Sequence, residues 1–375
     1  MNQLNKVIRL VKRPEGKPTM DVFQVDHEPI EKLKSGEYRM RNLCLSMDPA
    51  LVGRMRDEDN YVGKVELGEV MHSYGLGQVI ESKNPKVKVG GVRLGQVNMQ
   101  EYAVFSDEEA CKEINLGLTD LHNYLGAVGI TGATAYFALQ DIGRPKAGET
   151  VLISSGGSSV GSIAAQIANN LGCKTVAIVS TEEKTKQVKQ DFGFTQAVSY
   201  RGKSIEQLSR DIKKACPDGV DVYFDNTSGD ISEATLDNLN LYSRIVVVGR
   251  LAISHLADTT QDTGRRYHNI MLTNRVKKQG FVVLDYQDRM RGAFIRLARW
   301  IKEGKINGKE DVMHGIENIP HAFFRMLDGK SAGKQLVKLA EVDDALDKTP
   351  RWLGRLLTSR FFPTEKLAKK ITGGI

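Results

Sequence analysis

A glycine-rich stretch at 154–161, SSGGSSVG, has the residue types and spacing of a loop that binds nucleotide phosphates. An apolar run at 150–155 precedes it and predicts a buried strand, and an amphipathic run at 160–172 follows it and predicts a helix. In such loops the first glycine permits a tight turn, the second lets the backbone approach the pyrophosphate, and the third lets helix and strand pack closely. Gly156 and Gly161 occupy the first and third positions, whereas Ser158 stands at the second.

Ser158 does not remove the anion-binding chemistry of this stretch. The first turn of a helix presents amide groups and the positive end of its dipole to an anion. The hydroxyl of Ser158 or Ser159 could add a hydrogen bond, and Val160 belongs to the same turn. The sequence therefore predicts a dinucleotide-binding loop, and an inactive relic of such a loop is the alternative.

The end of the second predicted strand indicates which dinucleotide is bound. NAD sites usually carry an acidic residue there, which binds the ribose 2′-hydroxyl. Here the strand ends in hydroxyl residues, and Glu182 and Glu183 fall in the first turn of the next helix, where compensation of the helix dipole explains them. Lys184 and Arg201 could bind a 2′-phosphate, although each could equally be a solvated surface charge. NADPH is the expected cofactor.

The pattern of elements around the loop predicts an α/β fold. Residues 1–124 read as short strands separated by turns, which indicates a β-rich domain. From 125 to 306 strands and helices alternate, which predicts a doubly wound parallel sheet of the Rossmann type. Residues 307–340 read as strand, helix and strand, and we expect them to return to the first domain. Residues 341–375 form an appended tail.

The tail is basic and amphipathic. Residues 348–375 carry seven lysines and arginines against Glu365 alone, so nearly all of the net charge of +7 lies there and the rest gives no reason to expect nucleic acid as a partner. On a helix, Trp352, Leu353, Leu356 and Leu357 would share one face, with arginines around it. Packing on the protein itself or on a partner subunit is the commoner fate of such a helix, and contact with an anionic membrane is the alternative.

Composition narrows the class of protein. Of 375 residues, 41% are hydrophobic and 26% charged, which is typical of a globular protein, and no apolar run is long enough to span a bilayer. The N-terminal stretch has no apolar core of a signal peptide, and four widely spaced cysteines suit a reducing compartment, so a cytoplasmic location is expected. The histidines are dispersed, and no metal site is predicted.

Several motifs together resemble the zinc-independent medium-chain dehydrogenase/reductase superfamily, specifically its NADPH-dependent alkene reductases, which include prostaglandin and curcumin reductases. The resemblance covers about residues 5–340 and rests on LCLSMDPALVGRM, GITGATAYFAL, VGSIAAQIANNLGC, GFTQAVSYR, PDGVDVYFDNTSG, RIVVVG, LTNRVKKQGFVV, WIKEGKI and ENIPHAFFRMLDGKSAGKQLVK. It implies a GroES-like β-rich domain, NADPH, and hydride transfer to the β-carbon of an enone, with the enolate stabilised by hydrogen bonds. A quinone reductase is the alternative, and a homodimer is expected.

The resemblance also assigns cofactor contacts. Lys184 and Tyr200 would lie on the 2′-phosphate side, Asn226 would lie beside the cofactor, and Thr134 matches a threonine of the family. Ser331 replaces the asparagine of the family's G-x-N-x-G-K. Tyr200 and Phe281 could instead be ordinary core residues and Asn226 a turn residue. The lining of the nicotinamide would come from Val248, Gly249, Phe281, Val282 and Val283.

The substrate pocket departs from the family pattern. Ala50 stands where the family's D-P-Y-M-R motif has a tyrosine, and Thr273 stands where the prostaglandin reductases have another. Tyr61 and Tyr267 are the nearest remaining phenols and are candidate catalytic residues, with simple packing as the alternative for each. These departures also leave a second hypothesis, a nucleotide-binding protein with little catalysis that attaches to a membrane or a partner through its tail.

Overall fold

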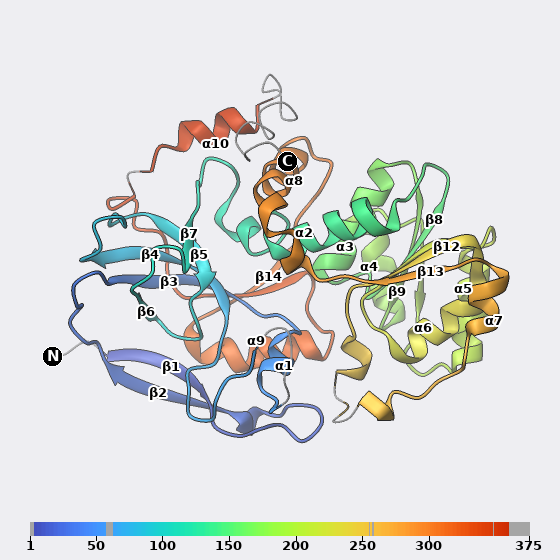
Figure 1. The fold of residues 1–375 in the computed structure, drawn as a ribbon, viewed down its shortest axis with the longest axis horizontal. Coiled ribbons are helices and arrows are strands. Elements are labelled where there is room, and N and C mark those ends of the chain that lie inside the picture. The colour runs from blue at the N-terminus through green and yellow to red at the C-terminus, as the bar shows by residue number, and fades with distance from the viewer. Residues whose placement is uncertain (1–3, 58–62, 255, 257–258, 348, 360–375) are drawn as a thin grey trace. The chain divides into compact units, whose positions relative to one another are not determined.

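The chain forms two compact units, which a computed structural model describes for residues 4–57, 63–254, 256, 259–347 and 349–359 (Figure 1). Unit 1 comprises Met1–Leu125 and Glu310–Ser359, and unit 2 contains Gly126–Lys309. None of the described helices is both long and apolar enough to cross a lipid bilayer.

A parallel sheet with the strand order β10-β9-β8-β11-β12-β13 forms the centre of unit 2. The strand order reverses between β8 and β11, and in such sheets ligands bind at the carboxyl edge beside this point. The central strands consist of buried apolar residues because helices cover both faces. The strands are β8 (Thr150–Ser154), β9 (Lys174–Val179), β10 (Gln196–Ser199), β11 (Val220–Asp225), β12 (Leu239–Val247) and β13 (Lys277–Gly280).

Helices pack on this sheet as right-handed crossovers require. One face is covered by α5 (Ile205–Ala215), α6 (Gly229–Thr235) and α7 (His268–Thr273), which share an apolar core with the strands. On the opposite face α3 (Ser159–Asn170) and α4 (Glu182–Phe192) pack on β9. The helix α2 (Ile130–Phe137) lies beside α3, and α8 (Met290–Lys302) packs on α2 (Figure 1).

The last strand of this sheet is shorter than its sequence predicts. The stretch KKQGFVVLD at 277–285 predicts one strand, but β13 ends at Gly280, and a 3-10 segment at Val283–Arg289 precedes α8. The neighbouring strand β12 ends at Val247, whose carbonyl accepts the amide of Phe281 at 3.0 Å. Beyond Phe281 the chain therefore has no adjacent strand with which to continue the ladder.

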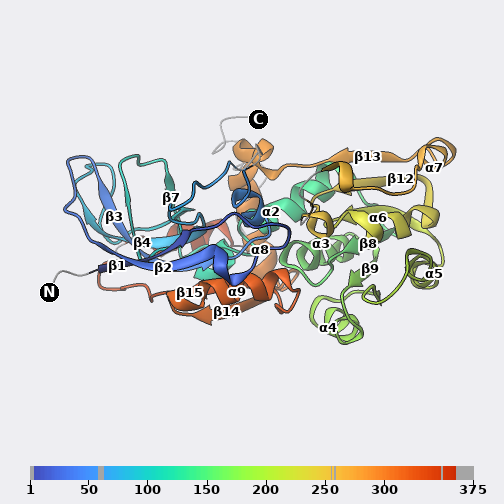
Figure 2. The same ribbon diagram turned by 90° about the horizontal axis from the view of Figure 1, so that it is seen from below.

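Unit 1 is built on an antiparallel-rich sheet of order β14-β15-β3-β4-β5-β7, with β6 paired to β3. Figure 2 labels β3, β4, β7, β14 and β15 of this sheet. Residues returning from unit 2 complete it, because β15 pairs antiparallel with β3. Ile8, Met40 and Phe323 belong to its main apolar core. The strands and helices are β1 (Leu4–Leu10), β2 (Phe23–Pro29), β3 (Tyr38–Ser46), α1 (Leu51–Arg54), β4 (Tyr74–Ser82), β5 (Val92–Gln96), β6 (Tyr102–Phe105), β7 (Cys111–Glu113), β14 (Glu310–His314), α9 (Ile319–Leu327), β15 (Lys334–Lys338) and α10 (Arg351–Leu357).

Candidate nucleotide site

The glycine-rich loop joins β8 to α3 through a tight turn. Ser155 has a φ of 53°, in the left-handed region that serine seldom adopts. A Cβ atom at Gly156 would lie 2.7 Å from the Cβ of Ala177 on β9, and one at Gly161 would overlap the carbonyl of Ser155. Both positions therefore require glycine. A side chain at 156 would push the loop away from β9, and a side chain at 161 would push α3 away from the turn.

Ser158 is the N-cap of α3. Its hydroxyl oxygen accepts a hydrogen bond from the amide of Gly161 at 3.1 Å, and its backbone is extended, with φ −76° and ψ 165°. A serine at this position thus satisfies one exposed amide of the helix, which glycine could not do. The earlier amides of the first turn, those of Ser159 and Val160, are the groups that such a helix offers to an anion.

Hydroxyl groups connect the beginning of α3 to the beginning of α2. Ser159 Oγ donates to Thr131 Oγ1 at 3.1 Å, and Thr131 in turn donates to the carbonyl of Gly126 at 2.8 Å. Thr134 lies one turn further along α2 and donates to the carbonyl of Ile130 at 2.8 Å. The hydroxyl proton of Ser159 is therefore used within the protein, whereas the oxygen of Thr134 can still accept a bond from a ligand.

Both acids after β9 have local partners. Glu182 accepts a hydrogen bond from the hydroxyl of Ser199 and lies 3.7 Å from the ammonium group of Lys203. Hydrogen bonds from its own backbone amide and from Thr181 lower the pKa of the Glu183 carboxyl. These contacts are those of acids in the first turn of a helix, where the dipole favours negative charge.

Lys184, Tyr200 and Arg201 lie where β9 and β10 end. Lys184 belongs to the first turn of α4, and its amide donates to the N-cap Thr181 at 3.4 Å. Tyr200 follows β10 directly, donates its amide to Val179 at 3.0 Å, and is partly buried against the core beneath α5. Arg201 is exposed. Because β9 and β10 are parallel neighbours, all three residues emerge at the same edge of the sheet.

A buried carboxylate that the sequence reading missed organises the loop after β11. Asp225 ends that strand and is 2% exposed. Its Oδ1 accepts hydrogen bonds from the Tyr223 hydroxyl at 3.1 Å and from the amides of Thr227 at 3.0 Å and Ser228 at 2.8 Å. The Ser232 hydroxyl donates to Oδ2. These bonds hold Ser228 at a φ of 59°, a conformation that serine rarely adopts.

The same loop ties three strand ends together. Asn226 donates its backbone amide to Ser154 Oγ at 2.9 Å and its side-chain amide to the Ser154 carbonyl at 2.7 Å. The amides of Val248 and Gly249 donate to the carbonyl of Asp225 at 2.8 and 3.0 Å. A Cβ atom at Gly249 would lie 2.7 Å from the Asn226 carbonyl oxygen. The carboxyl ends of β8, β11 and β12 are thus held in one arrangement at the reversal point of the sheet.

An aromatic group lies beyond the end of β13. Phe281 is 9% exposed, and its ring centre is 5.3 Å from that of Tyr286. Tyr286 stacks on Phe137 of α2 with centres 4.7 Å apart, and the guanidinium of Arg289 lies over both rings. Burial, and then the charge of Asp141, raise the pKa of Tyr286, so this phenol keeps its proton. Val282 and Val283, which lie between Phe281 and Tyr286 in the sequence, are partly exposed.

The remaining candidates are distributed differently. Tyr61 lies outside the described residues. The Tyr267 hydroxyl accepts a hydrogen bond from Lys278 Nζ at 2.8 Å, and its ring packs at the border of the core beneath α7. Ser331 lies in unit 1, just before β15, and is partly buried. The structure therefore gathers the other predicted cofactor residues in unit 2, along the carboxyl edge of the sheet and in α2.

Both units of the chain are similar to known oxidoreductases. A family model for the N-terminal domain of oxidoreductase matches residues 6–114, and one for zinc-binding dehydrogenase matches residues 159–300. A putative NADP-dependent oxidoreductase of Bacillus subtilis, YfmJ, is 37% identical over 91% of this chain and 99% of its own. This chain is a medium-chain dehydrogenase/reductase. Within that superfamily it belongs with the NADP-dependent reductases, as the resemblance predicted.

Two further medium-chain reductases are similar over nearly their whole length. The NADP-dependent 2-alkenal reductase of Nicotiana tabacum is 34% identical over 90% of this chain and 98% of its own. The crystal structure of CurA from Vibrio vulnificus in complex with NADPH superposes with a TM-score of 0.82, at 31% identity, over 90% of this chain and 99% of that one. The predicted two-part α/β fold is confirmed by this likeness.

Zinc ligands of the superfamily have no counterpart in the part of the chain that the structure describes. No group of three or more His, Cys, Asp or Glu side chains could hold a metal ion among those residues. The cysteines Cys44, Cys111, Cys173 and Cys216 are all buried. Burial raises the pKa of the Cys111 thiol to about 11, so this group is a poor metal ligand at neutral pH.

Proposed function

We propose that this protein reduces the carbon–carbon double bond of α,β-unsaturated ketones or aldehydes with NADPH. The proposal rests on the residues at the carboxyl edge of the parallel sheet in unit 2. There the loop between β8 and α3 leaves no room for side chains at Gly156 and Gly161. Both acids after β9 have local partners within the protein. Lys184, in the same helical turn, carries the positive charge that a 2′-phosphate needs.

The residues present fit NADPH. The first turn of α3 would receive the pyrophosphate, and Lys184, Tyr200 and Arg201 would surround the 2′-phosphate. Asn226, Val248, Gly249 and the residues 281–283 would border the nicotinamide, with Thr134 as a hydrogen-bond acceptor near it. When bound, NADPH supplies the hydride that such chemistry needs. Ser331, in unit 1, is a further proposed contact.

This reaction needs little general acid–base catalysis by protein side chains. As hydride adds to the β-carbon, the electron pair of the double bond moves onto the carbonyl oxygen, and a proton then adds to the α-carbon from water. A donor to the developing oxyanion lowers the barrier. Tyr286 is our candidate for this donor because its phenol stays protonated beside Phe281. Tyr267 and Tyr61 remain alternative candidates.

An isotope experiment tests this function. Purified protein would be incubated with an enone and NADPH deuterated at nicotinamide C4, and the product would be analysed by NMR. We expect deuterium on the β-carbon of a saturated ketone and far less turnover with NADH. Consumption of NADPH only with quinones would replace the enone by a quinone as the substrate, and no consumption with either class would refute reductase activity.

We also propose that the protein is a homodimer joined through unit 2. The edge strand β13 has four exposed residues, and in the described part of the chain no strand pairs with its outer side. Three large apolar side chains nearby in the fold, Leu241, Tyr242 and Leu272, are 57%, 65% and 76% exposed. Exposed edges and apolar patches of this kind mark interfaces. Light scattering should give twice the chain mass, and Leu272→Glu should reduce it to one chain.

A further inference from the structure

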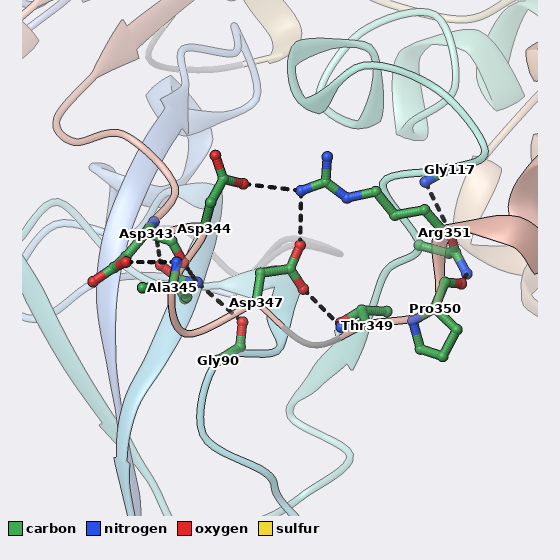
Figure 3. A network of polar contacts seen from close by, with 11 residues as sticks. Gly90, Gly117, Asp343, Asp344, Ala345, Asp347, Thr349, Pro350 and Arg351 are labelled. Atoms are coloured by element: carbon green, nitrogen blue, oxygen red, sulfur yellow. Dashed lines mark hydrogen bonds and ion pairs between the residues drawn. The ribbon is translucent and has the colours of Figure 1, made fainter.

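The segment between β15 and α10 is fastened to the sheet of unit 1. Gln78, which is 2% exposed, donates its side-chain amide to the carbonyls of Gly90 at 3.1 Å and Asp343 at 3.0 Å. It also accepts the amide of Asp343 at 2.8 Å. Further along, Arg351 is held by Asp344 and Asp347, each at 3.0 Å (Figure 3). The segment is therefore fixed at both ends before α10 begins.

The inner side of α10 touches the protein through its backbone. A Cβ atom at Gly117 would overlap the carbonyl of Arg351, and one at Gly354 would overlap the amide of Leu118. Asn115 donates its side-chain amide to the carbonyl of Pro350 at 3.1 Å. Because Gly354 and the buried Thr358 face inward, the larger side chains of the helix must point elsewhere.

The outer side of α10 carries those larger side chains. Trp352 is 66% exposed, Leu353 is 43% exposed and Leu356 is 41% exposed. Arg355 lies among them and is also exposed, and no carboxylate in the described part of the chain pairs with it. Single exposed apolar residues are ordinary on a protein surface. Three of them within five positions of one helix form an apolar patch, and such patches mark sites where another surface binds.

The positive charge of this region favours an anionic lipid surface over a second copy of the chain as the partner of α10. Arg351 is paired with Asp344 and Asp347, and from 355 to 370 the sequence has five further lysines and arginines and a single acid, Glu365. A second copy of the chain, docked symmetrically, would bring these cations against one another. A layer of anionic lipid headgroups would instead pair with them, while tryptophan and leucine side chains enter the boundary of the acyl region.

We propose that α10 docks the protein on a membrane surface that contains anionic phospholipid. The exposed apolar side chains of α10 would enter the membrane surface, and the cations that follow the helix in sequence would attract the anionic headgroups. This binding is peripheral and reversible, and it is expected to weaken as salt rises because surface charges are screened.

The chain offers its own probe for this binding. It has two tryptophans, Trp300 and Trp352, and Trp300 lies in α8 of unit 2. In a full-length Trp300→Phe protein, emission reports Trp352 alone. We expect a blue shift and co-sedimentation with vesicles of phosphatidylcholine containing about a third phosphatidylserine. Vesicles of phosphatidylcholine alone should give little of either, and high salt should reverse both.

Two variants and one control give the experiment its specificity. Leu356→Ser should reduce binding to the anionic vesicles, and Arg355→Glu should reduce it by roughly tenfold or more because it reverses a charge at the surface. Leu67→Ser is the control, since Leu67 is 52% exposed in the same unit but distant in sequence from the basic tail. Circular dichroism would show that each variant folds.

Three outcomes would overturn the proposal. One is the absence of a shift with anionic vesicles. The second is equal binding to both kinds of vesicle. The third is a blue shift of Trp352 that depends on protein concentration without lipid, which would assign the surface to a second copy of the chain.

Discussion

The buried hydroxyl of Tyr223 donates a hydrogen bond to Oδ1 of Asp225 at 3.1 Å, at the point where β11 ends. Burial raises the pKa of this phenol, so it remains a donor. The same carboxylate holds the amides of Thr227 and Ser228. Its charge thereby fixes a loop of the proposed NADPH site from beneath.

Asp225→Asn should therefore damage both stability and cofactor binding. An amide offers one acceptor where the carboxylate offers two, so buried donors lose partners. We expect the free energy of unfolding to fall by about 1–3 kcal/mol and the dissociation constant of NADPH to rise. Denaturant unfolding and NADPH titration measure the two effects. Asp218→Asn, at the exposed turn before the same strand, should change neither.

Lys184→Ala should weaken NADPH far more than NADH. Loss of a charged donor to a phosphate corresponds to roughly a 10- to 100-fold rise in the dissociation constant of NADPH. NADH has no 2′-phosphate, so its affinity should hardly change. Lys186→Ala, an exposed lysine of the same helix, is the matched control. Equal losses for both cofactors would remove Lys184 from the proposed 2′-phosphate site.

Ser158→Ala should destabilise the protein by about 1 kcal/mol because the cap on the amide of Gly161 is lost. Ser158→Gly should cost only a few tenths of that and leave NADPH affinity nearly unchanged, since glycine is the residue that the loop motif itself uses here. Thermal unfolding with and without NADPH separates these effects. A Ser158→Ala protein as stable as the parent would show that the cap contributes nothing.

Tyr286→Phe should lower kcat for an enone by about tenfold or more while leaving the KM for NADPH unchanged. Phenylalanine keeps the stacking on Phe137 and removes only the proposed donor. Steady-state kinetics with the saturated-ketone product as the readout would measure the change. Tyr267→Phe supplies the comparison, because a fall in kcat there instead would transfer the role to Tyr267.

Glu149→Gln should destabilise unit 2 in a pH-dependent manner. Arg244 binds both carboxylate oxygens, at 3.0 and 2.6 Å. Burial alone would raise the pKa of Glu149, but these bonds and the charge of Arg244 lower it below its usual 4.5. A lowered pKa in the folded state contributes stability that is present above the unfolded pKa and is lost as pH falls through the folded one.

The loss from Glu149→Gln should thus be about 1–3 kcal/mol near neutral pH and should shrink at pH values below about 4. Urea unfolding across this pH range would measure it. The control is Asp237→Asn, which breaks the exposed bidentate pair with Arg265 and should cost less than about 1 kcal/mol. A loss from Glu149→Gln that is the same at every pH would contradict the assignment.

The sequence predicted the α/β fold and the glycine loop because both depend on local periodicity. Gly156 and Gly161 follow from spacing alone. The bond that Ser158 makes could not be foreseen, since serine can donate or accept and the choice depends on where the amide of Gly161 lies. Asp225 was missed for a related reason. It ends an apolar strand, and its donors are identified only when the loop is folded around it.

The length of β13 shows another limit. The apolar residues 281–284 predict that the strand continues past Gly280, but a strand needs a neighbour, and β12 ends first. Sequence periodicity carries no information about where the neighbouring strand stops.

Gly117 lies directly against α10, a helix more than 230 positions later in the sequence. Its backbone is not left-handed, so only the carbonyl of Arg351 forbids a side chain there. About a tenth of this chain lies outside its match to the Bacillus subtilis relative. A reductase without residues 341–375 should tolerate alanine or serine at this position, and one that acquires such a segment should select glycine. Joint variation of position 117 and the C-terminal extension across genomes would therefore trace when the helix was added.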